Sequence, residues 1–116
     1  MSEPPLPARE LGDVPSVEVI SRAAVLLMSA AAEKLGLAEG SGPEDVDLDE
    51  ARRLITALAG LVTASAEYLG YHAGPLRDGV RSLQLAFRET ARVPDPPGHG
   101  PGERLTGAVY PRAGPA

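Results

Sequence analysis

Residues 47–69 read DLDEARRLITALAGLVTASAEYL. Apolar and small residues recur along this stretch in alternating steps of three and four, at Leu48, Ala51, Ile55, Leu58, Val62, Ser65 and Leu69. Such spacing places them on one face of a helix, a pattern typical of a helix that packs against partner helices. Asp47 and Glu50 have the spacing of an N-terminal cap. The stretch therefore predicts a helix over residues 47–69.

The flanking sequence predicts two further helices, near residues 14–35 and 75–91. The first is apolar around most of its circumference, because its polar residues fall on one narrow stripe, and Gly36 follows it where a helix end is expected. The last opens at Pro75, a residue favoured in the first turn of a helix. Its core stripe is Leu76, Val80, Leu83 and Phe87. We therefore predict an all-α fold, a small three-helix bundle.

Proline- and glycine-rich ends flank the predicted helices. The chain has 116 residues with 13 Gly and 12 Pro, and most of these lie outside the periodic regions. Segments with so little apolar surface do not bury enough to order themselves. We therefore expect a disordered leader over residues 1–12, a helical domain over 13–92 and a disordered tail over 93–116.

Composition excludes several classes of site. The absence of Cys rules out disulfides, thiolate metal ligands and cysteine nucleophiles. No apolar signal segment is visible near the N-terminus, and the most apolar run, residues 23–32, is far shorter than the roughly 20 residues of a membrane span. These features favour a cytoplasmic protein with no membrane partner.

Charge is divided unevenly along the chain. The net charge is −5, yet residues 51–116 carry eight bases against five acids. The acidic first half argues against bulk binding of nucleic acid. On the last helix, four arginines at helical spacings leave a local contact with RNA, a ribosome or an acidic partner open: Arg77, Arg81, Arg88 and Arg92. An ordinary solvated face is the simpler explanation for these arginines, and we favour that interpretation.

Motifs for metal binding or catalysis are incomplete. Asp45, Asp47 and Asp49 are similar to the start of a calcium loop, but Glu50 and Thr56 stand where that loop needs Gly and Glu. Helix-capping acids are the simpler interpretation. The only two histidines, at positions 72 and 99, have no companion ligands nearby in the sequence. We therefore predict no enzyme, no metal and no cofactor.

The first helix predicts self-association. Two neighbouring helices cover only about half of its apolar circumference, and monomers rarely expose large contiguous apolar patches. We expect the uncovered part to lie at Ala23, Ala24, Leu27, Ala30 and Ala31. A second copy related by two-fold symmetry is the commonest cover, which favours a homodimer or a larger even oligomer.

Residues 47–58, DLDEARRLITAL, resemble a widespread bacterial family of small helical proteins known as domain of unknown function 1844. The Leu35–Gly36 pair at the end of the first helix is also similar, and the resemblance covers about residues 16–90. Thr56 departs from the family's frequent Asp, and residues 68–75 replace its polar turn. The resemblance implies a helical fold and no assigned activity.

Two functions from different classes follow from the sequence. The first is a non-enzymatic structural or interaction protein acting as a homo-oligomer. The alternative is an accessory factor associated with RNA or the ribosome through the arginines of the last helix. The tail segment 105–112 adds a short apolar stretch, which is typical either of a motif that docks an unknown protein or of an ordinary tail.

Overall fold

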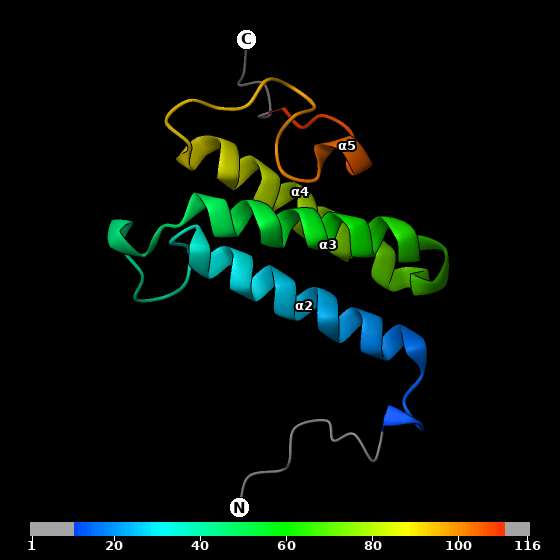
Figure 1. Ribbon diagram of the computed structural model, residues 1–116. Helices are drawn as coiled ribbons and strands as arrows, with labels where there is room; N and C mark the ends of the chain where they lie inside the picture. Colours follow the sequence, from blue (N-terminus) through cyan, green and yellow to red (C-terminus); the bar gives the residue numbers. More distant parts are fainter. Residues whose placement is uncertain (1–10, 111–116) are drawn as a thin grey trace, which may run out of the picture.

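The computed structural model describes residues 11–110, and three long helices dominate it (Figure 1). The long helices are α2 (Ser16–Lys34), α3 (Leu48–Leu69) and α4 (Ala73–Thr90). Shorter pieces are the 3₁₀ turns η1 (Pro43–Asp45) and η2 (Gly70–His72), and the one-turn helix α5 (Glu103–Thr106). No strand occurs in the described residues. The predicted all-α, three-helix architecture is therefore confirmed.

Helix α3 lies between α2 and α4 and packs against both (Figure 1). Its buried residues are Ala51, Ile55, Leu58, Ala59, Val62, Ser65 and Leu69. This set reproduces the seam predicted from the sequence, except that Leu48 is only half buried and Ala59 is added. Because α3 is covered on more than one side, it forms the centre of the core.

Helix α2 uses its alanines to approach α3, which corrects the predicted patch. Ala24 and Ala31 are completely buried in the core, and Leu27 packs against it. Ala23 and Ala30 are half buried. Ala24 and Ala31 were expected to face outward, but they are buried in the core, because a core with few large residues gains most contact when its helices come close together.

A glycine lies at the contact between α2 and α4. A Cβ atom at Gly79 would collide with the thioether end of Met28. Gly in the middle of a helix costs up to about 1 kcal/mol relative to Ala. Here the missing side chain makes room for Met28 of α2 to pack on α4.

The helix ends follow the local sequence signals. The side chain of Asp47 accepts a hydrogen bond from the backbone N–H of Glu50 at 3.2 Å. Gly36 has a positive φ of 74°. Its N–H donates to the carbonyl of Glu33, and the N–H of Leu37 donates to the carbonyl of Ala32, which is the pairing of a Schellman motif. These two caps place the connector between α2 and α3.

The expected disordered tail differs from the structure. Residues 93–110 run back across α3 and α4, and Pro101, Glu103 and Val109 are buried there. The prediction of disorder from composition was wrong for residues 93–110, because polar contacts with distant helices hold this Pro- and Gly-rich segment in place. The remaining tail residues 111–116 and the predicted leader residues 1–10 lie outside the described part of the chain.

The helical stretch Leu48–Thr90 is, by length and composition alone, apolar enough to cross a membrane. The core helix of a soluble protein meets the same criterion. Within this stretch Ile55, Leu58 and Leu69 belong to the common core of the bundle. Packing between helices therefore accounts for part of its apolar character.

Leu58→Ala is expected to lower the free energy of unfolding by about 2–5 kcal/mol, because it removes buried methyl groups and leaves a cavity in the central helix. Urea denaturation followed by circular dichroism measures this loss. Leu37→Ala is the matched control, since Leu37 is an exposed residue of the connector and should change stability by less than about 0.5 kcal/mol. Equal losses for the two variants would contradict the assignment of Leu58 to the core.

Candidate functional site

A single carboxylate closes the loop of residues 98–109, which we call the strap. The side chain of Glu103 is 0% exposed. Its Oε1 accepts hydrogen bonds from the backbone N–H of Gly98 at 3.2 Å and of Val109 at 3.1 Å. Glu103 therefore joins both ends of the strap, as in a compact surface loop whose ends lie close together.

Two side chains of α4 bind the strap from the helix side. Arg88 places its Nη1 3.6 Å from Oε2 of Glu103, and its side chain is only 14% exposed. One turn earlier, Gln84 donates from Nε2 to the carbonyl of Pro101 and to Oγ1 of Thr106, both at 3.0 Å. A largely buried ion pair, one buried hydrogen bond and one partly buried hydrogen bond therefore fix the strap on α4.

Glycines give the strap its close fit. Gly102 has a φ of 74°, and a Cβ added there would lie 2.5 Å from the Cβ of Ala59 on α3. A Cβ at Gly100 would collide with the Glu103 carboxylate. The glycines that suggested disorder are thus required for backbone approach and for burial of the carboxylate.

The segment that leads to the strap is anchored on α3. Nη2 of Arg52 donates to both carboxylate oxygens of Asp95, at 3.1 and 2.9 Å. The guanidinium group of Arg52 also lies 4.9 Å from the ring centroid of Phe87. This ion pair is partly exposed. We therefore expect it to fix the direction of the chain before the strap and to contribute little to the free energy of unfolding.

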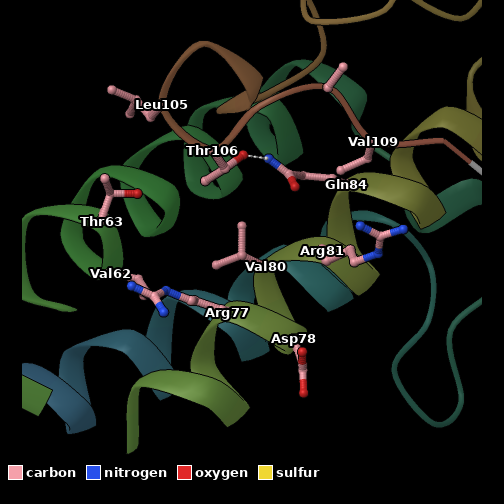
Figure 2. A pocket seen from close by; sticks show the side chains of 11 residues that line it. Val62, Thr63, Arg77, Asp78, Val80, Arg81, Gln84, Leu105, Thr106 and Val109 are labelled. Carbon is pink, nitrogen blue, oxygen red and sulfur yellow. Dashed lines mark hydrogen bonds between the residues drawn. The ribbon is translucent and has the colours of Figure 1, made fainter. Parts of the chain in front are cut away.

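A cavity of about 370 Å³ lies where the strap meets α3 and α4 (Figure 2). Its apolar lining includes Val62, Val80 and Val109, while Gln84 and Thr106 line another part of it through their mutual hydrogen bond. Exposed Arg77 and Arg81 of α4 also line it. Figure 2 shows their guanidinium groups on either side of Val80.

The four arginines predicted as one contact surface are divided by the structure. Arg77 and Arg81 are exposed beside the cavity. Arg88 is turned inward to Glu103, and exposed Arg92 follows the end of α4. The spacing of Arg88 correctly placed it on α4 but gave no sign of its partner, which lies 15 positions further along the chain.

The exposed apolar residues of α2 lie beside the predicted patch rather than in it. Val19, Val25 and Leu26 are 38%, 55% and 71% exposed. They share the outer face of α2 with polar residues that belong to the stripe seen in the sequence, namely Glu18, Arg22, Ser29 and Glu33. A shallow groove continues this face at Val17 and Val25 and ends at His72 of the η2 turn. We define the α2 outer face by seven exposed residues, which are Glu18, Val19, Arg22, Val25, Leu26, Ser29 and Glu33.

The other candidate residues have local partners. Asp45 accepts from the backbone N–H of Gly42 at 2.9 Å, which caps η1, just as Asp47 caps α3. The ring of His72 lies 4.3 Å from that of Tyr71, and His99 borders a hollow beside the strap. Among residues 11–110, no group of three or more His, Asp or Glu side chains is placed to hold a metal ion.

Sequence reasoning missed Gln84 and Glu103, the two residues on which strap docking depends. Gln84 was detectable, since it is a polar residue beside Leu83 and one turn before Arg88 on the apolar side of a helix. For Glu103, the only signal in the sequence was its position in a glycine-rich segment. No periodic pattern links the two residues, because a loop has none.

A family model described as a domain of unknown function, DUF1844, matches residues 16–89. The chain belongs to this family. The matched residues span α2 and α3 and end one residue before the end of α4, so the strap lies outside the match. Neither the curated proteins nor the solved structures contain a match to the chain.

Glu103→Gln is expected to release the strap, because the new amide nitrogen would face the guanidinium group of Arg88, donor against donor. Hydrogen exchange measured by NMR should become at least about tenfold faster at the amides of Gly98 and Val109, a loss of about 1.4 kcal/mol in docking free energy. Glu89→Gln, at an exposed neighbouring position on α4, is the control and should leave both rates unchanged. Unchanged protection in Glu103→Gln would show that the carboxylate does not hold the strap.

Proposed function

We propose that this chain is a non-enzymatic interaction protein that acts as a homodimer through the α2 outer face. The observation that carries the proposal is the exposure of Val19, Val25 and Leu26 on one side of a helix whose other side packs on the core. Apolar residues gathered on one face are typical of a contact surface, whereas scattered ones are not.

The order of residues on this face suits an antiparallel pair of α2 helices. A two-fold axis between Val25 and Leu26 would set Val25 against the partner's Leu26, and Arg22 against the partner's Ser29. Half-buried Ala23 and Ala30 flank this centre and allow the two helix backbones to come close. A two-fold interface requires such self-complementarity, because each surface meets its own copy.

The charges at the ends of the face support the same arrangement. Glu18 would lie opposite the partner's Glu33, which alone would be repulsive. Nη2 of Arg22 already lies 3.2 Å from Oε1 of Glu18, and the two-fold axis would bring it within one helical turn of the partner's Glu33. Each arginine would thus lie between two carboxylates, with Glu18 and Glu33 toward the ends of the interface.

Sedimentation equilibrium at micromolar concentration tests the proposal. The unaltered chain is expected at twice its mass of 12.0 kDa, and Leu26→Glu at 12.0 kDa, because it places two negative charges at the centre of the interface. Since Leu26 is exposed, the variant should remain as helical as the unaltered chain by circular dichroism.

Val93→Glu provides the matched control, since it adds the same charge at an exposed apolar position in the segment that follows α4. It is expected to sediment like the unaltered chain. A folded, unaltered chain that stays at 12.0 kDa would refute the dimer. A dimer that survives in Leu26→Glu would refute the assignment of its interface to the α2 outer face.

A further inference from the structure

The cavity beside the strap is lined by apolar side chains and by cationic side chains, which suit two different parts of one ligand. Val62 of α3, Val80 of α4 and Val109 of the strap supply an apolar surface from three separate elements. Arg77 and Arg81 supply cationic groups at the same cavity. Ligand pockets commonly combine an apolar body with a few convergent polar groups that fix orientation.

The two arginines are available to an anion. Within residues 11–110, the ion pairs use Arg22, Arg52, Arg53 and Arg88, and none uses Arg77 or Arg81. Asp78 also borders the cavity, but Figure 2 shows its carboxylate pointing away from the space between Val80 and Thr106. The cavity therefore has a cationic rim beside an apolar interior, and this arrangement favours a negative head group.

The volume limits the size of the ligand. At about 370 Å³, the cavity lies near the lower end of the range of about 300–1,000 Å³ for small-molecule sites. A neighbouring hollow that contains Arg52 is a weaker candidate, because Asp95 already occupies that guanidinium group. The cavity thus fits a small molecule with a short apolar body.

We propose that this cavity binds a small amphiphilic carboxylate, such as a medium-chain fatty acid. Its carboxylate would lie at the rim of the cavity, where the guanidinium group of Arg77 or of Arg81 would donate charge-assisted hydrogen bonds to the carboxylate oxygens. Its hydrocarbon chain would lie against Val62 and Val80 beneath Val109. The strap, fixed by Gln84 and Glu103, forms one wall of the site, so binding would require the strap to be docked.

Isothermal titration with octanoate tests the proposal. We expect saturable binding with one molecule per chain. Octanol, which has the chain without the charge, and inorganic phosphate, which has charge without the chain, should each bind at least about tenfold more weakly. Octanol binding as tightly as octanoate would overturn the role of the arginines, and phosphate binding as tightly would overturn the role of the apolar interior.

Variants locate the site independently of the choice of probe. The double variant Arg77→Gln and Arg81→Gln should weaken octanoate binding at least about tenfold, because it removes both charged donors. Arg53→Gln, at a well-exposed arginine that does not line the cavity, should bind octanoate like the unaltered chain. Equal weakening in both variants would indicate a general charge effect and would overturn the site.

A bulky residue at the rim gives a second test that does not change charge. Thr63 is exposed and lines the cavity, so Thr63→Trp should abolish octanoate binding while the helical circular dichroism signal is retained. Octanoate binding that persists in this variant would exclude the cavity. Leu26→Glu should bind octanoate normally, since the α2 outer face and the cavity are formed by different residues; the dimer and the ligand site can therefore fail separately.

Discussion

Burial of α3 on more than one side is the constraint on which the rest of the structure depends. The chain has one Phe, three Tyr and no Trp, so its core has few large side chains to fill space. Ala24 and Ala31 of α2 compensate by bringing that helix close to α3. Close approach keeps interior packing dense when side chains are small. It also leaves part of α3 and α4 uncovered by any long helix.

The strap covers that remaining part, and it does so with polar groups. Glu103 and Arg88 are both withdrawn from water, and neither could be buried alone without a large desolvation penalty. Paired, and supported by Gln84 and the strap's own backbone, they hold an otherwise apolar-poor segment in one conformation. A buried pair of this kind adds little net stability but specifies which loop conformation is allowed, so a Pro- and Gly-rich sequence is ordered here.

Two different surfaces result from this arrangement. The α2 outer face presents apolar residues at its centre with charges toward its ends, and its chemistry suits a second copy of the chain. On the other side of α3, the strap and α4 enclose a space with an apolar interior and two arginines at its rim. The family match ends before the strap, so the domain shared with the family provides only the helical side of that cavity.

The sequence by itself determined the helices, their caps at Asp47 and Gly36, and the seam of α3, because a helix repeats every 3.6 residues and its ends use near neighbours. The tertiary structure alone decided three features: that Ala24 and Ala31 face inward, that Arg88 turns away from solvent, and that residues 98–109 are ordered. Each of these depends on contacts between residues far apart in the chain, such as Arg88 and Glu103. Contacts between residues far apart in the chain produce no periodic pattern in the sequence. The Pro- and Gly-rich composition of residues 98–109 therefore suggested disorder, although the buried Glu103 carboxylate holds this segment in place.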